Sequence, residues 1–115
     1  ARAGACDAVS IYVGKAGGLA PARAIADFAL RHGLACTLGS NLELGVGSAA
    51  MIHLALSHRG ITPETYPCDI IGPFFYEDEI LETPLRLEAG RALPIDGPGL
   101  GVVLDDAKVE KYRVR

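Results

Sequence analysis

The sequence predicts an α/β fold, because short apolar runs alternate with helical patterns over the first 72 residues. The first run is rich in β-branched residues and alternates with a period of two, as a strand does. The apolar runs are joined by helix-like segments and not by tight turns, which is typical of β-α-β units with parallel strands. A chain of 115 residues can hold one core, and with 3 Phe, 4 Tyr and no Trp that core must consist of small and aliphatic side chains.

The first expected strand covers residues 6–13. Its apolar side carries three β-branched residues, Val9, Ile11 and Val13. Ser10 and Tyr12 fall on the other, mixed side, with Tyr12 nearest the carboxyl end of the strand. Residues 15–18 (Lys-Ala-Gly-Gly) are expected to form a loop.

The first helix is expected to begin near Pro21, a residue that suits the first turn of a helix. Its apolar stripe is predicted from the spacing i, i+3, i+4 and i+7 of Ile25, Phe28, Ala29 and His32. Gly33 should end the helix as its C-terminal cap. A second short strand then covers residues 34–39, and a polar, glycine-rich loop covers residues 40–47.

The second helix is expected over residues 48–59, and Gly60 ends it. It is apolar on almost every side, so other elements should cover most of its surface. A loop with two prolines leads to a third strand at residues 68–72. The tail should hold a hairpin within 85–94 turning at Ala89 and Gly90, a tight turn at 96–101, and a helix over 105–112 capped by Asp105 or Asp106.

Charge and composition exclude several partners. The net charge is −3 and no basic run occurs, which argues against nucleic acid or an anionic membrane as the main partner. No apolar stretch reaches the ~18 residues of a membrane span, and the first residues lack a signal-peptide layout, so we expect a cytoplasmic protein. The cysteines at positions 6, 36 and 68 fit neither a disulfide framework nor a metal clip, and are expected to be buried.

Three parallel strands with two crossover helices neither close a barrel nor cover a sheet. The first and third strands would each leave an open edge, and the apolar second helix would lack partners. We therefore expect that the 115 residues are the C-terminal piece of a larger protein, or that they pair tightly with another chain.

Several segments carry a family resemblance. Residues 7–19 (DAVSIYVGKAGGL) resemble the sixth barrel strand and following loop of the enolase superfamily, in its muconate lactonizing enzyme and mandelate racemase branch. Residues 38–50 (LGSNLELGVGSAA) are similar to the end of the seventh strand in the muconate lactonizing subgroup. Residues 69–74, 78–84 and 96–105 are similar to the eighth strand of this family and to the tail that follows it.

The resemblance implies the C-terminal part of a modified (β/α)8 barrel. Residues 1–72 would be its last three strands with their connecting helices, and residues 73–115 a tail that packs on the barrel and on an N-terminal capping domain. In this family Mg²⁺ is held by carboxylates at the ends of the third, fourth and fifth strands, and a lysine on the second strand removes a proton α to a carboxylate. The resemblance places all of these groups before residue 1, so no metal ligand is expected here.

Two catalytic residues are implied by the same resemblance. Tyr12 stands where the muconate lactonizing pattern has lysine, and a phenol with a pKa near ~10 is a poor base but a good hydrogen-bond donor or acid. Asp69 aligns with a glutamate near the reacting carbon, where it would orient substrate or tune a neighbouring base. The alternatives are that Tyr12 only fills the barrel interior and that Asp69 is held in a salt bridge.

Four further residues are implied to contact substrate. Lys15 is placed to reach the site, although a loop lysine beside two glycines is more often a solvated charge. Ser40 and Leu42 would line the pocket, and Glu43 would act as a polar group beside it. The alternative is that these three residues only cap the loop and the helix that follows.

The function implied is that of a Mg²⁺-dependent isomerase of muconate-cycloisomerase type, acting on a small carboxylate through an enolate. A single base suffices for that reaction, which is compatible with Tyr12. A dehydratase of acid sugars or hydroxy acids is the alternative within the fold, and racemisation ranks third because the second lysine is absent. A non-catalytic α/β binding module is the alternative outside enzymes. The implied partners are the missing N-terminal part and further copies in a homo-oligomer.

Overall fold

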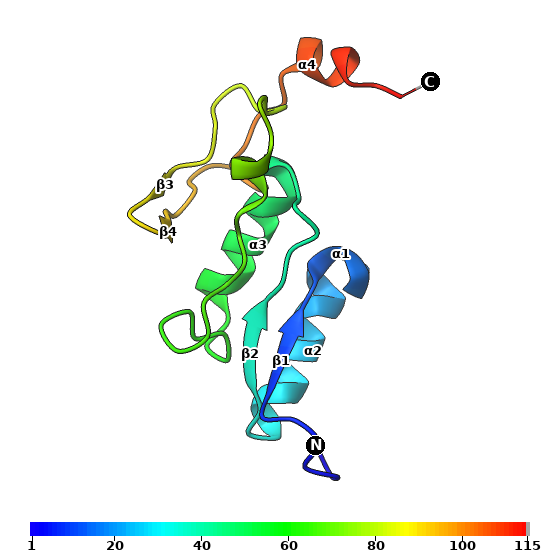
Figure 1. Ribbon diagram of the computed structural model, residues 1–115, viewed down its shortest axis with the longest axis vertical. Coiled ribbons are helices and arrows are strands. Elements are labelled where there is room, and N and C mark those ends of the chain that lie inside the picture. Colours follow the sequence, from blue (N-terminus) through cyan, green and yellow to red (C-terminus); the bar gives the residue numbers. More distant parts are fainter. Residues whose placement is uncertain (115) are drawn as a thin grey trace.

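The computed structural model describes residues 1–114 and measures about 50 × 34 × 26 Å (Figure 1). Its radius of gyration is 15.2 Å, larger than the ~13 Å expected of a compact domain of this length. The α/β unit with β1, β2 and α2 lies toward one end, and the tail extends away from it to α4 (Figure 1). The tail is therefore not folded back onto the strands. None of the helices within residues 1–114 is long and apolar enough to span a membrane.

The predicted parallel pair is confirmed. Strand β1 (Ala8–Ile11) pairs with β2 (Ala35–Leu38), with Ile11 opposite Leu38. Helix α2 (Leu19–Arg31) crosses between them, and Gly33 follows its end with φ +69°, as a C-terminal cap requires.

The first strand is shorter than predicted. It ends at Ile11, and the next residues enter a four-residue helix, α1 (Val13–Ala16), where a strand end and a loop were expected. The amide of Ala16 donates to the carbonyl of Tyr12 over 2.8 Å. Gly17 and Gly18 take φ values of +94° and +114°, which only glycine adopts easily, and so end this turn.

The third predicted strand, residues 68–72, does not form as a regular strand. Ile61 makes an isolated parallel bridge with Cys36, and the amide of Asp69 donates to the carbonyl of Leu38 over 2.7 Å. Pro67 has no N–H to extend the ladder, and the chain enters a 3₁₀ turn, Gly72–Phe75, directly afterwards. The segment thus adjoins β2 through a single ladder bond.

The stripe predicted for α2 is confirmed at Ala29 and wrong at Ile25, Phe28 and His32, which are exposed. The fully buried positions are three alanines, Ala22, Ala26 and Ala29. Ile25 and Phe28 are 42% and 49% exposed, and Phe28 stacks on His32 with ring centroids 4.1 Å apart. Small side chains let the helix approach the sheet closely, so the alanines face the core and the larger residues face outward.

Helix α3 (Gly45–Ser57) begins three residues before the predicted start. Its buried face includes Met51, Ile52 and Leu54, which confirms that other elements cover it. The expectation that all cysteines are buried is wrong for Cys6, which is exposed; Cys36 is buried.

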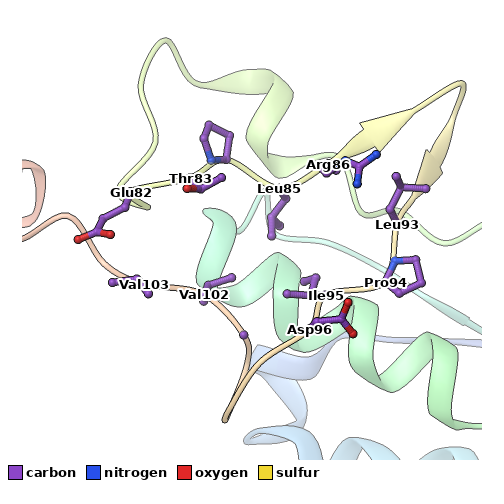
Figure 2. Close-up of a pocket in the computed structure, with 12 residues that line it drawn as sticks. Glu82, Thr83, Leu85, Arg86, Leu93, Pro94, Ile95, Asp96, Val102 and Val103 are labelled. Carbon is purple, nitrogen blue, oxygen red and sulfur yellow. The ribbon is translucent and has the colours of Figure 1, made fainter.

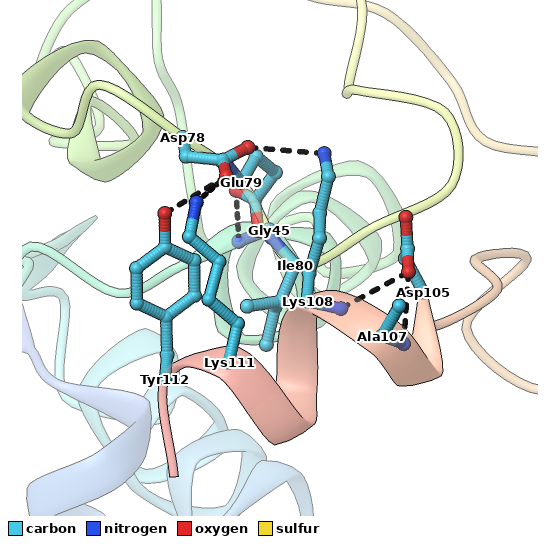
Figure 3. Close-up of polar contacts among 9 residues, drawn as sticks. All are labelled: Gly45, Asp78, Glu79, Ile80, Asp105, Ala107, Lys108, Lys111 and Tyr112. Atoms are coloured by element: carbon cyan, nitrogen blue, oxygen red, sulfur yellow. Dashed lines mark hydrogen bonds and ion pairs between the residues drawn. The ribbon is translucent and has the colours of Figure 1, made fainter.

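The tail follows the prediction closely. Strands β3 (Leu87–Glu88) and β4 (Arg91–Ala92) pair antiparallel around Ala89 and Gly90, whose φ values are +49° and +76°. Helix α4 (Asp106–Lys111) is capped by the side chain of Asp105, which accepts from the amides of Ala107 and Lys108 (Figure 3).

Asp78 ties α4 to the rest of the tail (Figure 3). Its carboxylate lies 3.0 Å from the ammonium of Lys108 and 3.3 Å from that of Lys111, and it accepts from the hydroxyl of Tyr112 over 2.8 Å. The hydrogen bond from Lys108, followed by that from Tyr112, holds the pKa of Asp78 well below its usual range. The carboxylate form is therefore favoured in the folded chain.

We predict that Asp78→Asn lowers the melting temperature of the full-length protein at pH 7. A carboxyl whose pKa is lowered on folding contributes stability above its unfolded pKa, near ~3.9, and that contribution is lost as pH falls toward the folded pKa. The difference between parent and variant should therefore shrink below about pH 4. Thermal melts from pH 7 to pH 2.5 measure it, with Asp7→Asn as the control because the Asp7 side chain has no ion pair among residues 1–114. A pH-independent difference would contradict this account.

Candidate active site

Three neighbouring backbone segments bring the predicted site residues to one end of the sheet. Tyr12 follows β1, and the amide of Gly39, directly after β2, donates to the carbonyl of Ile11 over 3.0 Å. On the other side of β2, Asp69 is bound to Leu38. The carboxyl ends of parallel strands are where α/β enzymes build their sites.

The ring of Tyr12 is confined by its neighbours. A Cβ atom at Gly39 would lie 2.5 Å from Cζ of Tyr12 and 2.6 Å from Oγ of Ser10, so only glycine fits there. The ammonium of Lys15 lies over the ring, 3.7 Å from its centroid, in cation–π geometry. Lys15 belongs to α1 and not to the predicted loop. A phenol and a cation therefore stand together after β1.

Gly39 itself was not singled out from the sequence. A single glycine at a strand end has many explanations, and its packing against Tyr12 depends on the pairing of two strands whose partner residues, such as Ile11 and Leu38, lie 27 positions apart in the sequence. The sequence signal available was only that Gly39 directly follows an apolar run.

Glu43 organises the loop after β2. Its Oε2 accepts from the hydroxyl of Ser40 over 2.6 Å and from the amide of Asn41 over 3.0 Å. Burial by itself raises the pKa of the Glu43 carboxyl, but the hydrogen bonds from Ser40 and Asn41 outweigh it and lower the pKa overall. Glu43 is thus held as a half-buried carboxylate whose charge is already partly satisfied by its own loop.

Leu42 has an unusual backbone in this loop. Its φ is +62°, in the left-handed region that disfavours side chains other than Asn or Asp. Its amide donates to Oγ of Ser40 over 2.7 Å, and its side chain is 36% exposed. Ser40, Leu42 and Glu43 are therefore brought together as one built loop, while their contact with substrate stays a prediction.

Asp69 is half-buried, and none of the ion pairs found within residues 1–114 involves it. The salt-bridged alternative thus has no partner among the residues that the structure describes. Its backbone position beside Leu38 places it across β2 from Tyr12. The catalytic role of both residues stays a prediction.

Two hollows lie away from these strand ends. One of about 280 Å³ is in the tail and is lined mainly by prolines and aliphatic side chains, among them Leu85, Leu93 and Ile95 (Figure 2). None of the six predicted site residues lines it. We therefore place the candidate site at the strand ends, where polar groups converge.

The other hollow, of about 730 Å³, lies where α2 and α3 end. There Nε2 of the buried His58 lies 3.1 Å from Oδ1 of Asp27, and the amide of Gly60 donates to Nδ1 over 3.1 Å. Because Nδ1 accepts, Nε2 carries the proton, and its hydrogen bond to Asp27 lowers the pKa of that carboxyl. The two residues of this pair lie 31 positions apart in the sequence, so the sequence pattern did not predict the contact.

The described residues do not fit a Mg²⁺ site. Mg²⁺ prefers several carboxylate and other oxygen ligands around one point. No group of three or more His, Cys, Asp or Glu side chains able to hold a metal ion occurs within residues 1–114. No chemistry through a metal ion is therefore assigned to this part of the chain.

The fold and the candidate site together indicate a class of protein. Parallel strands joined by a crossover helix, with tyrosine, lysine, serine and carboxylate groups at their carboxyl ends, are the arrangement of an α/β enzyme domain. The family is shown by a match over residues 1–108 to the model of the enolase C-terminal domain-like family. The chain belongs to the enolase superfamily, as its resemblance to the muconate lactonizing branch predicted.

Similar proteins and solved structures also support membership of this superfamily. Muconate cycloisomerase 1 from Rhodococcus opacus is 35% identical over 112 residues, which is 97% of this chain and 29% of that protein. The L-Lys-D/L-Arg epimerase from Methylococcus capsulatus is 37% identical over 102 residues, which is 89% of this chain and 28% of the epimerase. The crystal structure of 2-chloromuconate cycloisomerase from Rhodococcus opacus 1CP superposes with a TM-score of 0.89 at 36% identity, covering 96% of this chain and 30% of that one. The chain thus spans about three-tenths of the length of these relatives.

Proposed function

We propose that the chain is the C-terminal barrel segment of an isomerase that acts on a small carboxylate through an enolate, of muconate-cycloisomerase type. The observation that carries the proposal is the grouping of Tyr12, Lys15 and the 40–43 loop at the carboxyl ends of β1 and β2. It occurs in a chain 35% identical to a muconate cycloisomerase over 97% of its length. We further propose that the whole enzyme needs Mg²⁺, held by groups outside residues 1–114, and that it is a cytoplasmic homo-oligomer.

Lys15 and Tyr12, which follow β1, would have different roles. The ammonium of Lys15 attracts an anionic substrate group, and its position over the Tyr12 ring keeps it at the strand end. The phenol of Tyr12 donates a hydrogen bond to the substrate oxygen on which negative charge develops during the reaction. Asp69, on the far side of β2, orients the substrate.

Glu43 and Ser40 would shape the other wall of the pocket. Because Glu43 is held ionised by Ser40 and Asn41, it is unsuited to donate a proton at neutral pH. Its effect is to fix the loop and to set a negative potential at its base. Leu42 then presents an apolar side chain, which suits a substrate with a hydrocarbon segment between its polar groups.

One residue, Tyr12, favours cycloisomerisation over a racemisation that uses two bases. Racemisation needs a base on each face of the substrate, and Tyr12 stands where the resemblance expects the second lysine. A phenol donates a proton far more readily than it accepts one at neutral pH. The similarity to an epimerase therefore supports the superfamily more than it supports that reaction.

We predict that the full-length enzyme converts muconate or a chloromuconate to a lactone, and that EDTA abolishes the activity by at least about 10²-fold with recovery on adding Mg²⁺ or Mn²⁺. Loss of the conjugated-diene absorbance measures the reaction. Parallel assays use acid sugars, hydroxy acids and dipeptides, and follow loss of water or inversion at the α-carbon. Dehydration alone would establish the dehydratase in place of this proposal, and inactivity in every assay with metal present would favour a binding module.

A further inference from the structure

The loop that carries Ser40, Leu42 and Glu43 is held from outside by a distant part of the chain. The hydroxyl of Tyr76 donates to the carbonyl of Leu42 over 2.7 Å. Oε2 of Glu79 accepts from the amide of Gly45 over 2.7 Å, at the start of α3 (Figure 3). Both contacts join residues 34 positions apart in the sequence.

The fit between the two segments is close. A Cβ atom at Gly45 would lie 2.5 Å from Cδ1 of Leu81 and 2.9 Å from Oε2 of Glu79. Leu81 is fully buried, so the tail is anchored where it meets the helix. The tail therefore contacts the loop at its middle, through Tyr76, and at its end, through Glu79.

The Tyr76 contact falls on the one residue of the loop whose backbone is strained. Leu42 has φ +62°, and its amide is already bound to Ser40 inside the loop. The hydrogen bond to its carbonyl from Tyr76 is the contact that the tail adds. A left-handed leucine relaxes toward the extended region unless the surrounding contacts prevent it.

We infer that Tyr76 and Glu79 are positioning residues, which hold the loop 40–45 in its substrate-facing conformation and thereby set the affinity and selectivity of the site. They act through Leu42 and Gly45 and not by touching substrate. The inference rests on the proposed function, because that function supplies the substrate that the loop 40–45 would contact. The substrate class it addresses is the same small carboxylate with an apolar segment.

The test uses the full-length enzyme and two measurements. Tyr76→Phe keeps the ring and removes the hydroxyl, and Glu79→Ala removes the acceptor. Oε1 of Glu79 also accepts from the amide of Ile80 over 2.7 Å, so Glu79→Gln, with a single side-chain oxygen, can keep only one of the two contacts and should lie between the parent and Glu79→Ala. Tyr66→Phe is the control, because Tyr66 is a partly exposed tyrosine outside the loop and the tail.

We expect Tyr76→Phe and Glu79→Ala each to raise amide hydrogen exchange of residues 40–45 by about 3- to 10-fold, the range for losing one hydrogen bond. KM should rise by a similar factor while kcat stays within about twofold, and the preference between muconate and chloromuconate should change. Glu79→Gln should give an intermediate change in both measurements, and Tyr66→Phe should match the parent.

Hydrogen exchange and enzyme kinetics test the positioning role and the proposed function separately. If the parent shows no isomerase activity, the proposed function fails, and the exchange of residues 40–45 still decides whether Tyr76 and Glu79 hold the loop. Unchanged exchange in both variants overturns the inference. A lower melting temperature with unchanged KM and selectivity also overturns it, because these residues would then only stabilise the fold.

Discussion

Replacing Tyr12 with phenylalanine in the full-length enzyme is expected to lower kcat by roughly 10²-fold, the range for losing one acid or one hydrogen-bond donor in the transition state. Phenylalanine fills the same space against Gly39, and its ring still accepts the ammonium of Lys15, so the melting temperature should change little. Steady-state kinetics with muconate, together with thermal melts, measure both effects.

Two companion variants sharpen this expectation. Tyr12→Lys restores the residue that the resemblance expects, and slow exchange of the substrate α-proton with solvent deuterium should follow because a second base then faces the substrate. Tyr66→Phe is the matched control and should leave kcat unchanged. A kcat and kcat/KM for Tyr12→Phe within about twofold of the parent would mean that Tyr12 is packing, and that the chemistry depends on other groups.

Local sequence signals predicted the parts of the fold that local physics determines. The period-two pattern located β1, Gly33 marked the end of α2, and Asp105 capped α4 as expected. The hairpin turn at Ala89 and Gly90 could be predicted from the sequence, because such turns need a left-handed backbone conformation that glycine adopts most easily. Each of these features depends on residues within a few positions of one another.

The features that were missed depend on distant residues. Helix α1 has four residues, too few to show a helical period, and it is closed by two glycines. Helix α3 begins early because Glu79, 34 residues later, binds the amide of Gly45. Of the alanine face of α2, Ala29 was predicted, but Ala22 and Ala26 were overlooked because the neighbouring Ile25 and Phe28 are more hydrophobic.

The candidate site shows the same division. Tyr12 was singled out because it stands near the carboxyl end of an expected strand, and Asp69 because it aligns with an acidic position of the family pattern. Their catalytic roles come from that pattern and stay predictions. The confinement of Tyr12 by Gly39 and Lys15, and the hold of Tyr76 on Leu42, need the folded chain. Side chains that position others thus escape sequence patterns more readily than those at strand ends.

The largest effect on stability is expected from Gly72→Ala. A Cβ atom at Gly72 would overlap the carbonyl oxygen of Glu43 and lie 2.8 Å from its backbone nitrogen and carbonyl carbon. Backbone atoms cannot rotate away as a flexible side chain does, so the 3₁₀ turn and the 40–45 loop must separate. Overpacking of this kind costs about 1–3 kcal/mol or more. We expect a clear fall in the melting temperature of the full-length enzyme.

The same substitution should also weaken the site, because Glu43 is the residue whose backbone is displaced. Its carboxylate holds Ser40 and Asn41, and its carbonyl accepts from the hydroxyl of Ser48 over 3.0 Å, so movement there spreads through the loop into α3. Gly14→Ala is the matched control, because its added Cβ meets only Nδ2 of Asn41, at an ordinary 3.9 Å. Thermal melts and kcat/KM on parent, Gly72→Ala and Gly14→Ala make the comparison. If Gly72→Ala melts within about 2 °C of the parent, well under the shift that overpacking implies, the close approach of Gly72 to Glu43 is not a feature of the folded enzyme.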